Sequence, residues 1–225
     1  KKASNNVSNE EIITNFVEAT KGIKNLKLEN EYSITENQSK NELMKVNWES
    51  LVIKEPFAAK IDLSMMGITS IIYIKDGNGY MLEPFTNKWE KEKEGTEEVD
   101  ILYSLYLPIA DEFYDALKAN IDKVNIEKKG ENYIITTTDV EFFEAAIKEQ
   151  YNLMFFAISK VNNFGFEYVV DGKTLLPVAF NFTVDFSNDE NDNKVVSMTS
   201  KYSEINEIKD IELPDEAKNA QGVKK

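Results

Sequence analysis

The sequence contains no cysteine, no histidine and no arginine, so all 26 of its basic residues are lysine. The absence of cysteine excludes disulfides and thiol nucleophiles, and the absence of histidine excludes imidazole bases and the commonest zinc and haem ligands. Arginine is the preferred bidentate donor to phosphate and guanine, and the chain carries a net charge of -14. Both properties disfavour nucleic acid and anionic membrane surfaces as partners. We therefore expect no nucleic-acid partner, no cofactor and no metal.

Catalytic residue patterns are also scarce in this chain. Carboxylate pairs occur at Glu97-Glu98, Asp111-Glu112 and Asp189-Glu190. Glycosidase chemistry needs two carboxyl groups held about 5 to 9.5 Å apart in a cleft, and nothing in the sequence places these pairs in one. No glycine-rich loop of the kind that cradles phosphates is present. We expect no catalytic residues and no enzymatic activity.

One loop has the opening of a calcium site. Asp189, Asn191 and Asn193 follow the D-x-N-x-N pattern of an EF-hand, whose oxygen ligands alternate in this way. The sixth position of such a loop is glycine and the twelfth is glutamate, but here they are Lys194 and Ser200. A solvated hairpin loop therefore explains the pattern better than a metal site.

The stretch from Phe57 to Trp89 predicts antiparallel strands joined by tight turns. Apolar residues alternate with polar ones between Phe57 and Met65, and a strand shows successive side chains on opposite faces. Ile68, Ile72 and Ile74 continue the alternation, and Ile71 and Tyr73 make the second face partly apolar as well, which predicts a strand covered on both sides. The sequence Asp76-Gly77-Asn78-Gly79 suits the positive φ angles of a hairpin turn.

Similar patterns extend along most of the chain. Ser8 and Glu11 form a capping box that predicts a helix ending near Gly22, and Asp139 is the expected N-cap of a long helix reaching Ile158. Residues 96–117 predict two further helical segments on either side of Pro108. Alternation slips near Glu49-Ser50, which predicts a β-bulge. We count about ten or eleven strands and about four helices, which predicts an α+β fold in which one large, curved antiparallel sheet, an open half-barrel, packs helices on its concave face.

Large aromatic and methionine side chains are expected to meet between the sheet and the helices. They either fill a core or line an elongated apolar cavity that binds a lipid or another hydrophobic small molecule. The alternative function is an extracellular interaction module with a filled core that binds a protein or a cell-wall partner. The expected cavity residues are Phe57, Ile61, Met65, Ile72, Tyr80, Leu82, Trp89, Leu102, Tyr106, Phe155, Phe180 and Phe182.

Several motifs resemble an uncharacterised family of Gram-positive surface lipoproteins. They are residues 61–67 (IDLSMMG), 72–77 (IYIKDG), 84–89 (PFTNKW) and the closing segment 213–220 (LPDEAKNA). More remotely, the order of elements resembles the LolA and LppX/LprG superfamily, whose members bind acyl chains between a half-barrel and its helices. The resemblance covers Ser8 to Ala220 and implies a non-catalytic, lipid-binding surface lipoprotein. It matches no ligand-contacting residue individually.

The same resemblance implies a domain organisation and a location. Residues 1–7 are expected to be a flexible tether, residues 8–220 a single LolA/LppX-like domain, and residues 221–225 a disordered tail. A lipid anchor upstream of Lys1 would hold the protein, as a monomer, on the extracellular face of the cell membrane. A signal peptide would accompany that anchor.

Overall fold

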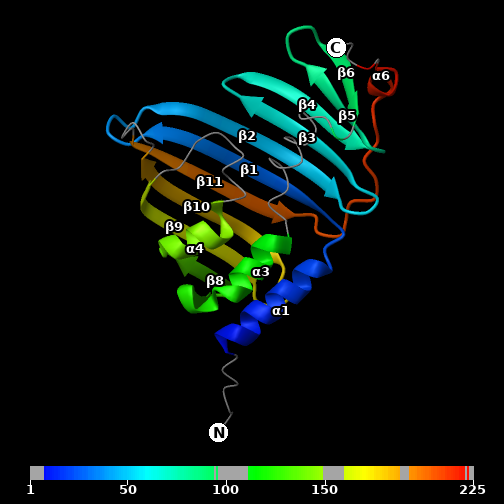
Figure 1. Ribbon diagram of the computed structural model, residues 1–225. Coiled ribbons are helices and arrows are strands. Elements are labelled where there is room, and N and C mark those ends of the chain that lie inside the picture. Colours follow the sequence, from blue (N-terminus) through cyan, green and yellow to red (C-terminus); the bar gives the residue numbers. More distant parts are fainter. Residues whose placement is uncertain are drawn as a thin grey trace.

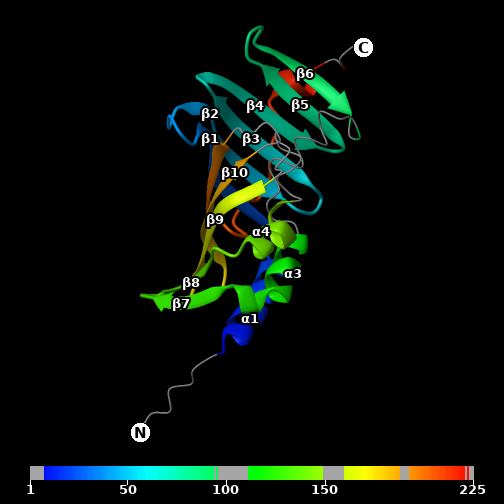
Figure 2. The same ribbon diagram turned by 60° about the vertical axis from the view of Figure 1, so that its left-hand side comes forward.

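An eleven-stranded antiparallel sheet dominates the computed structural model, which describes residues 8–93, 95, 111–148, 160–187, 193–220 and 222. The strands lie in the order β6-β5-β4-β3-β2-β1-β11-β10-β9-β8-β7. The sheet twists and curves into an open half-barrel with helices on its concave side (Figure 1, Figure 2). This architecture confirms the α+β half-barrel that the sequence predicts.

Two meanders build the sheet, and they meet where β1 pairs with β11 in antiparallel register. Each strand of a meander pairs with the next strand along the chain, as expected for chains with short turns. The first meander consists of β1 (Asn25–Glu36), β2 (Glu42–Ile53), β3 (Ala58–Met65), β4 (Ile68–Lys75), β5 (Asn78–Glu83) and β6 (Lys88–Lys93). The second consists of β7 (Asn125–Lys129), β8 (Asn132–Thr137), β9 (Lys160–Asp171), β10 (Pro177–Ser187) and β11 (Asn193–Ser203).

Two tight turns confirm the hairpins that the sequence predicts between β3, β4 and β5. Met66 and Gly67 have φ angles of 51° and 82°, and Asp76 and Gly77 have φ angles of 53° and 69°. Positive φ at both central residues matches the right-handed twist of the flanking strands. The short polar Asp76 and the two glycines suit this conformation, whereas Met66 adopts it with a bulky side chain.

The described helices are α1 (Asn9–Lys21), α3 (Asp111–Ala119), α4 (Val140–Ala146) and α6 (Asp215–Lys218), with a 3-10 turn η1 (Ile121–Lys123). The Ser8 hydroxyl accepts a hydrogen bond from the Glu11 amide at 3.1 Å, which confirms the predicted cap of α1. Asp139 caps α4 by accepting from two backbone amides. The predicted helical segment of residues 96–110 and the predicted continuation of α4 to Ile158 lie outside the described residues.

The main core lies between the sheet and helices α1, α3 and α4. Phe16 of α1 contacts Tyr168 of β9 with ring centroids 5.2 Å apart, and Phe113 of α3 stacks on Tyr168 at 5.9 Å. Phe142 and Phe143 of α4 pack against rings of the same strand. These helices therefore cover the half of the concave face that β9 and its neighbours form (Figure 2).

A second, smaller core lies on the outer face of the sheet. Residues 208–220, which include α6, return across β2 to β6 and bury Ile211 and Ala217 against Tyr73 and Tyr80. The sequence predicts helices on the concave face alone, and the position of α6 corrects that prediction. The outer aromatics need this cover because their burial removes apolar surface from water.

The outer core also explains why the predicted bulge at Glu49-Ser50 is wrong. Leu51 and Ile53 lie on the outer face and pack against the second core, so no change of phase occurs at this point of β2. The register with β1 shifts near the start of β2 instead, where Leu43 is the extra residue.

None of the helices that the structure describes has the length and apolarity needed to cross a bilayer.

Candidate ligand-binding face

The concave face of the five central strands is the strongest candidate for a functional surface. The strand register places one set of alternate residues on this face, and we call that set the central concave face. None of its side chains is charged, although 29% of all residues in the chain are charged. It consists of alternate residues from Leu26 to Ile34 on β1, Met44 to Val52 on β2, Ala59 to Met65 on β3, Ile68 to Ile74 on β4 and Val196 to Tyr202 on β11.

Half of the predicted cavity residues share the concave side of the sheet. Ile61, Met65 and Ile72 belong to the central concave face, and Phe180 and Phe182 extend the same side along β10. Phe57, which lies just before β3, is the sixth of these residues and is partly buried against the main core. Ile61 and Phe182 are 0% and 1% exposed, so both side chains are fully packed on the concave side of the sheet.

Three predicted cavity residues lie on the outer face of the sheet, which corrects the expectation that they converge beneath the helices. Tyr80 and Trp89 belong to the outer core, and Leu82 lies opposite Trp89 in the register of β5 and β6. Trp89 contacts the ring of Tyr73 at 5.8 Å, and the ammonium of Lys91 lies 5.4 Å from the centre of the Tyr80 ring. These side chains stabilise the outer core and face away from the concave side.

The remaining three predicted cavity residues belong to segments that the structure does not describe. Leu102, Tyr106 and Phe155 lie outside the described residues, and so do positions 189–192 of the loop with a calcium-site opening. Within the described ranges, no group of three carboxylates is arranged to hold a metal ion.

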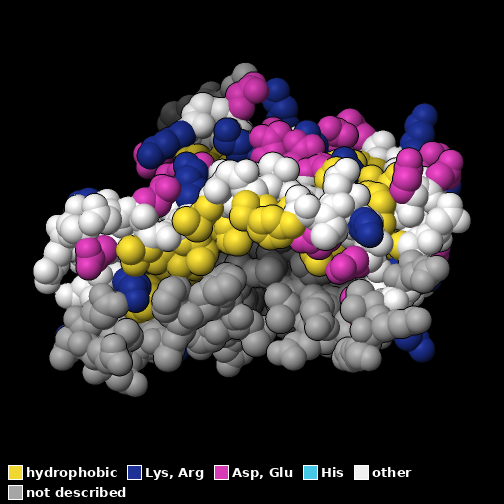
Figure 3. Space-filling view, turned by 90° about the horizontal axis from the view of Figure 1, so that it is seen from above, with side chains coloured by type: hydrophobic (Ala, Val, Ile, Leu, Met, Phe, Trp, Pro, Cys, Tyr) yellow, Lys and Arg dark blue, Asp and Glu magenta, His cyan; other side chains and the backbone are white. Residues whose placement is uncertain are grey.

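Part of the concave side stays open at one margin. Met65, Ile68 and Met81 are 39%, 40% and 37% exposed, and Met65 lies opposite Ile68 in the β3–β4 register. Met81 lies opposite Ile72 and so points to the same side. Seen from above, hydrophobic side chains form a band across the described surface (Figure 3). The apolar face therefore continues from the core to a region that solvent reaches.

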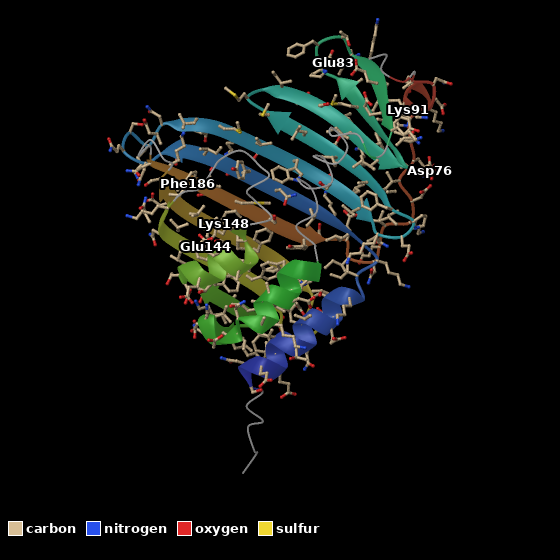
Figure 4. All side chains as sticks on the ribbon, viewed as in Figure 1. Asp76, Glu83, Lys91, Glu144, Lys148 and Phe186 are labelled. Carbon is tan, nitrogen blue, oxygen red and sulfur yellow. The ribbon has the colours of Figure 1, made fainter. Side chains whose placement is uncertain are left out.

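Charged side chains lie around this face rather than on it. Glu144 on α4 and Lys148, just beyond the end of α4, form an ion pair of 2.5 Å, and Asp76, Glu83 and Lys91 lie at the far corner of the sheet (Figure 4). Burial on the central concave face raises the pKa of Tyr32 to about 12, so this phenol is neutral at physiological pH. The described part of the face therefore offers uncharged contacts only.

A polar cluster interrupts the central concave face. Asn30 of β1, Ser50 of β2 and Ser200 of β11 are 6%, 0% and 1% exposed. Ser200 donates its hydroxyl hydrogen to Asn30 Oδ1 across the β1–β11 pair. Sequence analysis missed this cluster, although Asn30 stands at one of the alternate positions of β1 that are otherwise apolar, between Leu28 and Tyr32. A polar residue at such a position is the signal that could have found it.

A separate pocket of about 190 Å³ lies at the turns that join β2 to β3 and β4 to β5. Lys75 closes one side of it through a 3.0 Å ion pair with Asp210. Its volume is below the range of about 300 to 1,000 Å³ that is typical of small-molecule sites. The lining residues are Ile53, Glu55, Pro56, Phe57, Ala58, Lys75, Asp76, Lys209 and Asp210, and among the predicted cavity residues only Phe57 is one of them.

Comparison with solved structures finds the same architecture elsewhere. The lipoprotein LppX of Mycobacterium tuberculosis superposes with a TM-score of 0.50 at 13% identity, over 91% of this chain and 98% of that one. A LolA superfamily protein from Nitrosomonas europaea has a TM-score of 0.31 at 10% identity, over 93% and 96% of the two chains. At these identities the likeness to LppX shows a shared fold, and the second score is too low to carry an argument.

Comparison with curated proteins gives no match. A family model does match, and it covers residues 8–222, which include every described helix and strand. The chain therefore belongs to the family of unknown function DUF6612.

Proposed function

We propose that this protein binds a lipid or another hydrophobic molecule on the concave side of its sheet and catalyses no reaction. The observation that carries this proposal is the uncharged central concave face with its open margin, where Met65 and Ile68 of that face and the adjoining Met81 of β5 are 37% to 40% exposed. Exposed apolar surface is costly in water, and its cover by a ligand would gain about 25 cal/mol per Å². The alternating register holds these side chains on one rigid sheet, so the surface is formed before any ligand arrives.

The proposed location is the extracellular face of the cell membrane of a Gram-positive cell. The motifs noted in the sequence and the fold shared with LppX, which is itself a lipoprotein, support a lipid anchor upstream of Lys1. Residues 1–7 would be the tether and residues 8–220 one monomeric domain. Labelling of cells with a fatty-acid probe, followed by purification of the full-length protein, tests the anchor directly.

Lipid extraction and mass spectrometry of the detergent-free protein test the binding proposal. We expect defined acyl species with the wild type, fewer with Met65→Glu, and an unchanged amount with Met66→Glu. The control is closely matched, because Met66 is the next residue and is 76% exposed at the turn, outside the concave face. A folded wild type that carries no lipid and takes up none from phosphatidylcholine vesicles would overturn the proposal.

One observation favours a second function, the binding of a protein or cell-wall partner. Phe85 is 81% exposed in the turn between β5 and β6, where the Glu83 carboxylate accepts from the amides of Phe85 and Thr86 at 3.1 and 2.5 Å. These bonds order the turn, so the ring is presented to solvent on a fixed support. Phe85→Ser should abolish retention on purified cell wall and leave lipid uptake unchanged if this surface is the functional one.

A further inference from the structure

The polar cluster on the central concave face contains two groups that the fold leaves unsatisfied. Asn30 Nδ2 and Ser50 Oγ are buried and have no hydrogen-bond partner among the residues that the structure describes. A buried polar group without a partner costs about 1 to 3 kcal/mol, and native proteins satisfy nearly all of them. Their presence inside an apolar surface therefore requires an explanation.

The two groups are close neighbours on the same face. Asn30 lies opposite Trp48, and Ser50 lies opposite Leu28, so Asn30 and Ser50 are diagonal across the β1–β2 pair. Diagonal positions of this kind are about 7 to 8 Å apart. Ser200 engages Asn30 Oδ1 from the other side, which leaves the amide nitrogen as the group that is available to donate. The cluster therefore presents two donors a short distance apart.

The charge of the surroundings limits what these donors can bind. No lysine belongs to the described central concave face, so a buried phosphate or carboxylate would have no counter-ion there. Burial of an unpaired anion costs far more than a hydrogen bond returns. A neutral acceptor such as an ester or amide carbonyl oxygen has no such penalty. Apolar residues on both sides, including Leu28 and Ile61, suit the alkyl chains that flank such a carbonyl.

We propose that Asn30 and Ser50 form a subsite that donates hydrogen bonds to the ester or amide carbonyls of a bound acyl lipid. This inference rests on the proposed function and narrows it, because it assigns the ligand class as an acyl ester or amide. A pure hydrocarbon would leave both donors unsatisfied, and a free fatty acid would bring an unpaired charge. The separation of the two donors suits a lipid with two neighbouring carbonyls.

An ester and an ether probe of equal chain length test the subsite. Dipalmitoylglycerol has two carbonyl oxygens, and dihexadecylglycerol has the same chains without them. We expect the wild type to bind the ester about tenfold more tightly, because about 1.4 kcal/mol from the two hydrogen bonds corresponds to a factor of ten. Ser50→Ala should reduce this preference to about threefold. It should not lower the melting temperature, because it removes an unsatisfied hydroxyl.

Ser70→Ala is the matched control. Ser70 lies on the same concave face, but its hydroxyl already donates to the Leu82 carbonyl oxygen at 2.8 Å, so the ester preference should stay tenfold. Equal binding of ester and ether by the wild type would overturn the subsite and leave the proposed function intact. No binding of either probe would overturn both. A Ser50→Ala variant with an unchanged preference and a lower melting temperature would show a structural role, such as a bound water, and would also overturn the subsite.

Discussion

Tyr168 on β9 donates a hydrogen bond to the hydroxyl of Tyr202 on β11, with 3.2 Å between the two oxygens. Because Tyr168 has a single hydroxyl hydrogen, the hydroxyl of Tyr114 on α3, 3.3 Å away, is the donor to Tyr168. The chain of three phenols links a helix to two strands of the sheet through the main core. Burial, followed by the neighbouring phenols, raises the pKa of Tyr168 well above its ordinary value. The Tyr168 phenol is therefore neutral at physiological pH and can keep both hydrogen bonds.

Tyr168→Phe should lower the free energy of unfolding by about 1 to 3 kcal/mol, because it removes the shared partner of two buried hydroxyls. Urea denaturation followed by circular dichroism gives this difference. Tyr133→Phe is the control, since the Tyr133 ring on β8 is only partly buried and keeps its contact with Lys128. A loss of equal size in both variants would mean that the hydrogen bonds of Tyr168 contribute nothing specific.

Stability should fall as the pH rises above 10, and Tyr32 gives the clearest reason. Burial raises its folded-state pKa to about 12, whereas the unfolded chain has the ordinary value of about 10. Below pH 10 both states hold the proton, and between about pH 10 and 12 the unfolded chain loses it first. The free energy of unfolding should then decrease by about 3 kcal/mol. Urea titrations at several pH values should show a shallower decrease for Tyr32→Phe, and identical slopes would contradict the assignment.

Gly172→Ala should destabilise the turn between β9 and β10. A Cβ atom at Gly172 would lie 2.2 Å from the backbone oxygen of Glu131, which is also the acceptor for the Gly172 amide. The backbone of the β7–β8 turn or of the β9–β10 turn would have to move, at a cost of about 1 to 3 kcal/mol. Gly165→Ala on β9 is the control, because its added Cβ meets no atom within 4 Å. Thermal melts that rank the two variants equally would refute the steric argument.

Much of the sheet could be predicted because its information is local. The Asp76-Gly77 turn confirms its sequence signal with two positive φ angles, and the alternation from Val178 to Phe186 produces β10. A period of two also assigns residues to faces within each strand. These features depend on neighbours in the sequence and need no knowledge of distant contacts.

The identity of each face could not be predicted, because β4 and β5 are apolar on both sides. Alternation shows that Ile72 and Tyr73 point in opposite directions, but it does not show which direction leads to the helices. The answer depends on the return of residues 208–220 across the outer face, which is a contact between distant parts of the chain. Tyr80 and Trp89 therefore lie on the face opposite to the one that the sequence predicts. The buried cluster around Asn30 depends in the same way on the pairing of β1 with β11.

Ile211→Ala should show that the outer core contributes to stability and not to lipid uptake. Ile211 is 3% exposed in the outer core, so its truncation should lower the free energy of unfolding by about 2 to 4 kcal/mol. Uptake of dipalmitoylglycerol per folded molecule should not change, because the substitution lies on the opposite side of the sheet from the central concave face. Glu212→Ala, at the neighbouring exposed position, controls for changes in the segment itself. Loss of uptake by folded Ile211→Ala would mean that the outer core shapes the binding face.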